Sequence, residues 1–265
     1  MAPDTDDIGA LIASARAAIR SASSIVVLTG SGISAESGIP TFRGAHELAP
    51  DADGKATRPL WADFDPQALA TPEAFRADPE MVTRWYDWRR LKCLGVQPNA
   101  GHRALADLQR SIVDRGARWT LLTQNVDGLH QRAGSEGVVE LHGSITAWRC
   151  AQTGTPAEMP DRALDAFPSV HPETGHPIRP GVVWFGEALP EHAVTAAADA
   201  LADCDVFLSV GTSSVVYPAA GFIHSARASG AMTIEVNPDA TPISGVIDIA
   251  LRGKAGEVLP QLVST

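Results

Sequence analysis

Four short, largely apolar runs constrain the fold of this chain more than any other feature of its sequence. A run of four or five apolar residues without alternation is typical of a strand that is buried on both faces of a parallel sheet. Stretches with helical spacing separate the runs, so the sequence predicts an α/β fold with a doubly wound, parallel, Rossmann-like sheet. The predicted strands lie at residues 25–28, 119–123, 206–210 and 233–236, and the predicted helices at 8–19, 100–114, 193–202 and 219–229.

Two regions interrupt this alternation. Residues 44–97 form a long insertion with helical stretches of its own, and residues 151–178 form a proline-rich, loop-like segment. We expect both to build a smaller lobe against the sheet, within a single domain that spans residues 1–265. The large lobe is expected to comprise residues 1–43, 98–147 and 181–265, and the small lobe residues 44–97 and 148–180.

The chain is acidic, with a formal net charge of −10 over 265 residues. An acidic protein repels polyanions, which argues against nucleic acid as a partner and requires local arginines for any anionic substrate. No apolar run approaches the roughly 20 residues that a membrane-spanning helix needs, and the acidic N-terminus lacks the pattern of a signal peptide. Its three cysteines are far apart, which argues against a disulfide framework. These features predict a cytoplasmic protein with no membrane partner.

The first predicted strand leads into the sequence GSGISA, residues 30–35, which has the pattern G-x-G-x-x-A. Glycines in such a turn let the backbone approach a pyrophosphate, and the following helix N-terminus adds N–H donors and a positive dipole. The pattern by itself is equally compatible with a tight turn that holds no ligand. Its place between a strand and a helix favours dinucleotide binding.

Six sequence blocks, in order along nearly the whole chain, resemble the motifs of the sirtuin family of NAD-dependent protein deacylases. They are GSGISAESGIPTFRG at 30–44, TQNVDGLHQRAG at 123–134, ELHGS at 140–144, RPGVVWFGE at 179–187, GTSSVVYPAA at 211–220 and EVNPD at 235–239. The resemblance implies NAD as the cofactor and acylated lysine side chains of proteins or peptides as the partner. Ser31 departs from the family, which usually has alanine there; the small side chain keeps the backbone route open but could change cofactor affinity.

Polar residues within these blocks carry chemistry that agrees with the resemblance. Asn125 and Asp127 follow the second predicted strand, at the edge where parallel sheets bind ligands. An amide and a carboxylate suit recognition of a carboxamide such as nicotinamide, although these side chains also cap helices. A histidine at a strand end is well placed as a general base near neutral pH, and the resemblance gives this role to His142. His102 is expected at a helix start, and His130 in the packing or on the surface.

The resemblance also implies a reaction and a set of site residues. The acyl group of an acyl-lysine would be transferred to ADP-ribose, giving free lysine, nicotinamide and O-acyl-ADP-ribose. His142 would take a proton from a ribose hydroxyl, Phe42 would shield the ribose carbon from water, and Arg43 would contact the phosphates or the ribose. The implied cofactor-binding residues are Gly30, Ser31, Gly32, Ile33, Ser34, Thr41, Phe42, Arg43, Gln124, Asn125, Val126, Asp127, Gly211, Thr212, Ser213, Asn237, Pro238, Asp239 and Ala255. The implied substrate-binding residues, which would hold the peptide as an added strand between the lobes, are Tyr86, Arg89, Val183, Trp184, Phe185, Gly186, Glu187, Val216 and Tyr217.

The proline-rich segment departs from the family pattern. Sirtuins usually carry two pairs of cysteines that bind a structural zinc ion. Here the expected positions fall on Cys150, on Thr153, near His171 and on Thr174. Zinc requires four nitrogen or sulfur ligands, and only three candidates, Cys150, His171 and His176, are at hand. We therefore expect no zinc, and a loop held by packing and rigid turns.

The sequence RWYDWRR, residues 84–90, concentrates aromatic residues and arginines on one predicted helix. Positions three or four apart share a helix face. One stripe, expected in the core of the small lobe, is Met81, Trp85, Trp88 and Lys92; the neighbouring stripe is Val82, Tyr86, Arg89 and Cys93. This places the Tyr86 hydroxyl beside the Arg89 guanidinium, an arrangement that by itself is typical of a surface arginine next to a packed tyrosine.

Together with the following PNAGHRAL and with Thr41, this sequence resembles the sirtuin branch that removes acidic acyl groups. In that branch a tyrosine and an arginine at this spacing bind the acyl carboxylate, and an arginine fork can pair both carboxylate oxygens. The sequence therefore predicts a preference for succinyl-, malonyl- and glutaryl-lysine, with weak deacetylase activity. The alternatives are a sirtuin-type ADP-ribosyltransferase or NAD glycohydrolase, a general deacetylase, a non-catalytic NAD-binding module and a nicotinamide dehydrogenase.

Overall fold

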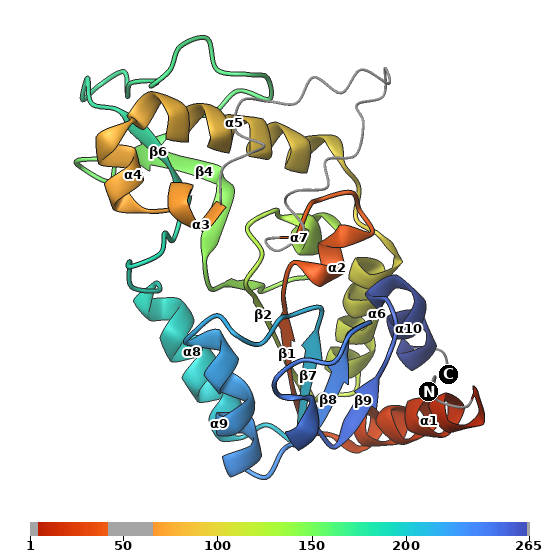
Figure 1. The fold of residues 1–265 in the computed structure, drawn as a ribbon. Coiled ribbons are helices and arrows are strands. Elements are labelled where there is room, and N and C mark those ends of the chain that lie inside the picture. The colour runs from red at the N-terminus through yellow and green to blue at the C-terminus, as the bar shows by residue number, and fades with distance from the viewer. Residues whose placement is uncertain (1–4, 42–65, 264–265) are drawn as a thin grey trace.

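A computed structural model describes residues 5–41 and 66–263 (Figure 1). Within them, six strands form one parallel sheet in the order β3-β2-β1-β7-β8-β9. The chain reverses its direction of travel across the sheet between β1 and β7, and open α/β sheets bind ligands at such a point, beyond the carboxyl ends of the strands. The strands are β1 (Ser24–Thr29), β2 (Arg118–Thr123), β3 (Val139–Glu140), β7 (Val206–Val210), β8 (Met232–Val236) and β9 (Ile249–Leu251).

Helices cover both faces of this sheet, as Figure 1 shows. Successive residues of a strand point to opposite faces, so β1 places Ile25 and Val27 in one core and Val26 and Leu28 in the other. The first core is closed by α1 (Thr5–Ser21), α6 (Ala100–Asp114) and α10 (Ala255–Val263). The second is closed by α8 (Glu191–Ala202) and α9 (Phe222–Ala228). Every residue of β1 is buried, which explains the unbroken apolar run at residues 25–28 in its centre.

A smaller lobe lies beyond the carboxyl edge of the sheet (Figure 1). It contains a three-stranded antiparallel sheet in the order β5-β4-β6 and three described helices. These elements are β4 (Gly143–Cys150), β5 (Pro156–Ala157), β6 (Ile178–Val182), α3 (Pro66–Leu69), α4 (Pro72–Ala77) and α5 (Pro79–Gly95). The boundary predicted at residues 147 and 148 therefore falls inside β4, which pairs with β6 at residues 143–144 and again at 148–150.

The expected α/β class with a parallel, Rossmann-like sheet is confirmed. All four predicted strands and four predicted helical regions are present, and the region 219–229 divides into a 3-10 turn, η1 (Ala219–Gly221), followed by α9. The short edge strand β9 and the sheet of the small lobe were not predicted, whereas β3 lies in the strand-like sequence VVEL, residues 138–141, that was expected before His142. The remaining short elements are α2 (Gly32–Ala35), α7 (Leu129–Arg132) and η2 (Ser244–Val246). Among the described residues, no helix combines the length and apolar character needed to cross a membrane.

The prediction of which stripe of α5 is buried was wrong in part. Trp85 is buried as expected, but Trp88 is half-buried and Lys92 is exposed. The more deeply buried line is the neighbouring one, which contains Val82, Tyr86 and Cys93. The reason is that α5 packs against aromatic residues of other elements: the Tyr86 ring lies 6.2 Å from that of Trp184, between centroids.

Candidate active site

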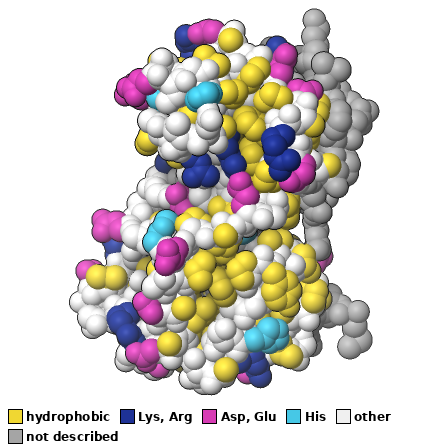
Figure 2. All heavy atoms as spheres, turned by 90° about the vertical axis from the view of Figure 1, so that its left-hand side faces the viewer, with side chains coloured by type: hydrophobic (Ala, Val, Ile, Leu, Met, Phe, Trp, Pro, Cys, Tyr) yellow, Lys and Arg dark blue, Asp and Glu magenta, His cyan; other side chains and the backbone are white. Residues whose placement is uncertain are grey.

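A cavity lies between the two lobes, at the carboxyl ends of β1, β2 and β7. The space-filling view in Figure 2 shows the molecule narrowing between the lobes, with apolar side chains gathered on the large lobe and charged side chains on the facing part of the small lobe. The exposed apolar residues at the mouth include Phe185, Val215 and Tyr217. The cavity is lined by Gly30, Ser31, Ser34, Ile39, Pro40, Ala70, Tyr86, Arg89, Cys93, Gln124, Asn125, Val126, Asp127, His142, Val182, Val183, Trp184, Phe185, Gly186, Glu187, Leu189, Thr212, Ser213, Val215, Val216 and Tyr217.

The glycine turn that follows β1 packs directly against the loop that follows β7. The N–H of Gly32 donates to the carbonyl oxygen of Gly211 over 2.8 Å. A Cβ atom on Gly30 would lie 2.8 Å from the Cα atom of Thr212, and one on Gly32 would lie 2.7 Å from the Gly211 oxygen. Both glycines are thus required by the close approach of two loops, which brings Ser31 of one and Thr212 of the other to the same cavity.

Asn125 and Asp127 are joined to this turn by buried hydrogen bonds. The Ser34 hydroxyl donates to Asp127 Oδ2 over 2.7 Å, and Asn125 Nδ2 donates to the Gly30 carbonyl oxygen over 3.1 Å. Asp127 Oδ1 also accepts from the Leu129 N–H at the start of α7, so the side chain supports a helix start and lines the cavity at once. Burial raises the pKa of Asp127, while the hydrogen bonds from Leu129 and Ser34 act in the opposite direction.

A histidine that the sequence placed only at a helix start extends this network. His102 belongs to the capping box of α6, where its Nδ1 accepts from the Asn99 N–H over 3.4 Å. Its Nε2 lies 3.3 Å from the Ser34 oxygen. Because the Ser34 hydroxyl already donates to Asp127, Nε2 is the donor of this pair. Burial lowers the pKa of His102 to about 4, which keeps the ring neutral near pH 7. The expectation of a helix start was right, but nothing in the sequence indicated the contact with Ser34.

His142 lies two residues beyond β3 and is half-buried in the wall of the cavity. Its Nδ1 lies 3.0 Å from the carbonyl oxygen of Gln124. Since a carbonyl oxygen can only accept, Nδ1 carries the proton and Nε2 keeps the lone pair that a general base needs. Burial lowers the pKa of His142, and the hydrogen bond to Gln124 partly offsets this effect.

Tyr86 and Arg89 reach the cavity from α5 in the small lobe. Tyr86 is buried, with its ring 4.5 Å from that of Trp85 between centroids, and the Arg89 guanidinium lies 4.8 Å from the Trp85 ring. Burial raises the pKa of Tyr86 to about 12, while the positive charge of Arg89 acts to lower it. Tyr86 is therefore a neutral hydroxyl beside a cation. Cys93, two turns further along α5, lines the cavity too; its i, i+7 spacing from Tyr86 was the available signal.

The segment after β6 is shaped by an ion pair. Both oxygens of Glu187 accept from the Arg179 guanidinium, over 2.7 and 2.9 Å, and one of them also accepts from the Trp184 N–H over 2.9 Å. The guanidinium in turn lies 3.3 Å from the Trp184 ring centroid. Burial acts to raise the pKa of Glu187, but the hydrogen bonds from Arg179 and Trp184 lower it overall. Glu187 therefore holds the segment that carries Phe185 in place, and it also lines the cavity.

All nine residues predicted to bind substrate line the cavity, and so does His142. The predicted cofactor residues divide into two groups. Those that line it are Gly30, Ser31, Ser34, Gln124, Asn125, Val126, Asp127, Thr212 and Ser213. Those that do not are Gly32, Ile33, Thr41, Gly211, Asn237, Pro238, Asp239 and Ala255. Several of the second group support the first: Asn237 Nδ2, for example, donates to the Thr212 carbonyl oxygen over 2.9 Å. Phe42 and Arg43 lie outside the described residues.

Cys150 and His171, at or near the positions where the sirtuin pattern has zinc ligands, are hydrogen-bonded within the segment and do not suit a metal. Cys150 Sγ accepts from the Thr174 hydroxyl over 3.2 Å and from the Thr153 N–H over 3.4 Å. His171 Nε2 lies 3.0 Å from the Pro156 carbonyl oxygen, so this nitrogen carries a proton, and its Nδ1 accepts from the Glu173 N–H. Across residues 5–41 and 66–263, no three His, Cys, Asp or Glu side chains are grouped so that they could hold a metal ion. The segment is joined here by hydrogen bonds.

Similarity to known proteins identifies the family of this chain. Residues 30–218 match the model of the Sir2 family. NAD-dependent protein deacylase 1 of Pseudomonas aeruginosa is 50% identical over 246 residues, which cover 90% of this chain and 92% of that protein. NAD-dependent protein deacylase 2 of Pyrobaculum aerophilum is 47% identical over 238 residues, 90% of this chain and 89% of that protein.

Solved structures agree with these sequence matches. A Sir2 homologue in complex with NAD has a TM-score of 0.84 and 42% identity, over 95% of this chain and 92% of that chain. A Sir2 protein with a deacetylated p53 peptide and 3′-O-acetyl ADP-ribose has a TM-score of 0.80 and 27% identity, over 95% of this chain and 96% of that chain. The chain therefore belongs to the sirtuin, or Sir2, family of NAD-dependent protein deacylases, which act on acylated lysine in proteins or peptides.

Proposed function

We propose that this deacylase prefers lysines that carry acidic acyl groups, succinyl and malonyl first and glutaryl as a longer candidate. The observation that carries the proposal is the presence of Tyr86 and Arg89 in the wall of the cavity that also contains His142. The guanidinium fork can pair both oxygens of an acyl carboxylate. Tyr86, with its pKa raised to about 12 by burial, remains protonated and can donate a further hydrogen bond. In a chain with a net charge of −10, such a local pair is needed to hold an anion.

His142 is proposed as the general base of the reaction. Its hydrogen bond to the Gln124 carbonyl fixes the tautomer with a free lone pair on Nε2, and its lowered pKa keeps that lone pair available at neutral pH. In this role His142 Nε2 takes the proton of a ribose hydroxyl. When bound, NAD supplies the ADP-ribosyl group that receives the acyl group from lysine.

The large-lobe residues of the cavity fit NAD by the chemistry of their donors and acceptors. Asp127 has a carboxylate that can accept from an amide N–H, and Asn125 presents an amide beside it. Gly30 and Ser31 let the backbone approach a pyrophosphate. We infer that Gln124, Thr212 and Ser213 bind the rest of the cofactor and that Gly32, Gly211 and Asn237 support them from behind.

The peptide is proposed to lie between the lobes as an added strand, along residues 183–187 and 216–217. Exposed Phe185 and Tyr217 flank the opening of the cavity, where the residues next to the acyl-lysine would lie. The two lobes in this proposal form one catalytic domain. Its small lobe needs no zinc, because hydrogen bonds to Cys150 and His171 occupy the atoms that would bind it.

The decisive experiment compares acyl groups that differ only in charge. Purified enzyme, NAD and one peptide sequence are combined with acetyl-, succinyl-, malonyl-, glutaryl- or succinamoyl-lysine, and O-acyl-ADP-ribose is measured by mass spectrometry. Succinamoyl is the matched control, since an amide replaces the carboxylate at nearly equal size. We expect a higher kcat/KM for succinyl than for succinamoyl or acetyl. Equal values for succinyl and succinamoyl would contradict the proposal, and consumption of NAD without acyl transfer would favour a glycohydrolase.

A further inference from the structure

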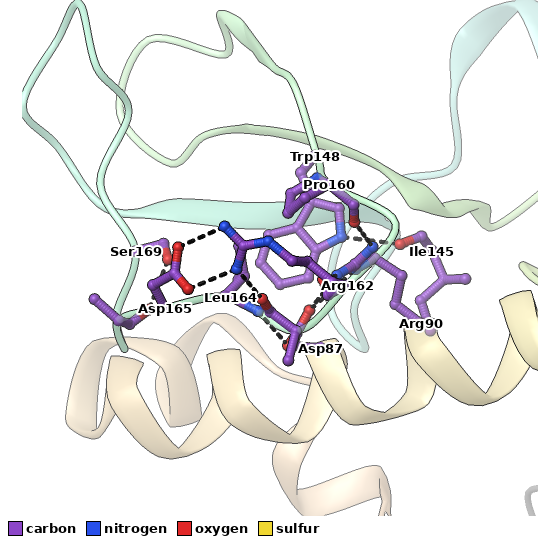
Figure 3. Close-up of polar contacts among 11 residues, drawn as sticks. Asp87, Arg90, Ile145, Trp148, Pro160, Arg162, Leu164, Asp165 and Ser169 are labelled. Carbon is purple, nitrogen blue, oxygen red and sulfur yellow. Dashed lines mark hydrogen bonds and ion pairs between the residues drawn. The ribbon is translucent and has the colours of Figure 1, made fainter.

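A buried ion pair lies on α5 next to the residues that line the cavity. Asp87 and Arg90 are 2% and 1% exposed, and neither lines the cavity. Arg90 donates to Asp87 Oδ1 from Nε over 3.0 Å and from Nη2 over 2.6 Å (Figure 3). Taking two charges out of water is costly, so such a pair persists only where further hydrogen bonds satisfy it. The remaining hydrogen-bond partners of the pair therefore show which segment it is attached to.

Those partners all belong to the backbone of one loop of the proline-rich segment. Arg90 Nη1 donates to the Pro160 carbonyl oxygen over 2.5 Å, and Nη2 to that of Arg162 over 2.7 Å. Asp87 Oδ2 accepts from the Leu164 N–H over 3.0 Å. Figure 3 shows the two side chains reaching from α5 to this loop. We call the two side chains with these three backbone contacts the Asp87–Arg90 clamp.

The position of the clamp on α5 ties it to Tyr86 and Arg89. Each clamp residue directly follows one of the proposed acyl-binding residues, and neighbouring residues of a helix point about 100° apart. A helix turns as a rigid body, so α5 cannot rotate toward or away from the cavity without breaking the clamp. Its C-terminal end is held separately, because the Arg132 guanidinium of α7 donates to the carbonyl oxygens of Cys93 and Val96, over 2.9 and 2.5 Å.

We infer that Asp87 and Arg90 are positioning residues that set the place of Tyr86 and Arg89 in the cavity, and with it the selectivity for acidic acyl groups. The inference rests on the proposed function. The clamp also joins α5 to the proline-rich segment, so a charge pair holds the helix to this part of the small lobe. A purely structural pair would contribute to stability and leave the ratio of activities on succinyl and acetyl peptides unchanged.

The test measures kcat and KM for succinyl and acetyl peptides in Arg90→Gln and in the double variant Asp87→Asn/Arg90→Gln. A displacement on the order of 1 Å can cost about 10²-fold in rate, so we expect the succinyl-to-acetyl ratio of kcat/KM to fall by about that factor, mainly through a higher KM for succinyl. Arg90→Gln leaves Asp87 as an unpaired buried charge and could unfold the protein. The double variant keeps the polar groups without an unpaired charge, and its melting temperature and circular dichroism establish that it is folded.

Arg162→Ala is the matched control. Its guanidinium pairs with Asp165 in the same loop (Figure 3). Both side chains are exposed, at 65% and 80%, so we expect a wild-type ratio. A folded double variant with the wild-type ratio, or with equal losses on both peptides, would overturn the inference. Arg90→Lys should recover part of the ratio, because it restores the charge but not the fork. A wild-type enzyme without succinyl preference would overturn the proposed function first and the positioning role with it.

Discussion

The two lobes place polar chemistry in different ways. In the large lobe, β1 is buried along its whole length, and the polar side chains that reach the cavity follow the carboxyl ends of strands, as Asn125 and Asp127 do. In the small lobe, one helix brings polar groups to two sides: Tyr86 and Arg89 line the cavity, and the Asp87–Arg90 clamp is buried against a loop. The topology of the parallel sheet thus determines where the polar groups of the large lobe lie. The placement of the polar groups on α5 depends instead on specific side-chain contacts with distant segments.

This contrast separates two functions. The large-lobe residues would serve every acyl group, because they are proposed to bind NAD and move a proton. The small-lobe pair would act only on acyl groups that carry a carboxylate. Damage to the large-lobe site should therefore remove all activity, and damage to the small-lobe site should change selectivity.

The largest effect is expected for His142→Ala, which removes the proposed general base. Such a loss typically costs about 10²–10⁴-fold, and we expect it for acetyl and succinyl peptides alike, in kcat measured with saturating NAD. His224→Ala, on the exposed side of α9, should retain full activity. Retention of most activity in folded His142→Ala would remove His142 from the mechanism.

Arg89→Met should distinguish the roles of the two lobes most clearly. Truncating one partner of a desolvated charge pair costs about 2–5 kcal/mol, which corresponds to roughly 30-fold to several-thousand-fold at 1.4 kcal/mol per decade. We expect this loss in kcat/KM for succinyl peptides and little change for acetyl peptides. Arg84→Met is the control, because Arg84 lies on the same helix but forms an exposed pair with Glu80. Equal losses on both peptides would show that Arg89 is structural.

Tyr86→Phe should have a smaller effect in the same direction. Removing one hydroxyl deletes a single hydrogen bond, typically worth about 0.5–1.5 kcal/mol, or roughly 2- to 10-fold in kcat/KM for succinyl. The aromatic packing against Trp85 and Trp184 remains, so the melting temperature should change little. A large loss on the acetyl peptide instead would indicate that the hydroxyl supports the common site.

The pH dependence should report the environment of His142. A general base acts in its neutral form, and burial lowers the pKa of His142 below its ordinary value of 6.5. The imidazole therefore stays neutral as the pH falls through 7 and 6.5, and kcat/KM on an acetyl peptide should decline only in more acidic solution. An acidic limb with its midpoint above 6.5 would contradict this assignment.

The smallest expected effect is that of a chelator. With hydrogen bonds occupying Cys150 and His171, the purified protein should contain no stoichiometric zinc, and its melting temperature should not change when a chelator is added. Structural zinc typically contributes about 10–16 kcal/mol of apparent binding energy, so a real site would be evident. One zinc ion per chain by elemental analysis would contradict this prediction.

The sequence predicted the large lobe well, because unbroken apolar strands and the groups that follow them are local features of the chain. Helix spacing also predicted that Tyr86 and Arg89 lie on one side of α5, and both line the cavity. It failed where distant segments decide the outcome. The buried side of α5 is set by Trp184 and by the loop around Arg162, and neither can be deduced from the helix itself. Likewise, only the fold brings His102 to Ser34, 68 positions away.

The Asp87–Arg90 clamp has a consequence for how the chain folds. Arg90 and its acceptor Pro160 are 70 positions apart, and the second strand of the large sheet lies between them. Closing so long a loop is entropically unfavourable until the intervening segments are ordered. We expect the clamp to form after the rate-limiting step of folding, so that replacing it accelerates unfolding far more than it slows refolding. The lifetime of the folded small lobe, rather than the speed with which it assembles, would then be the property that this buried pair controls.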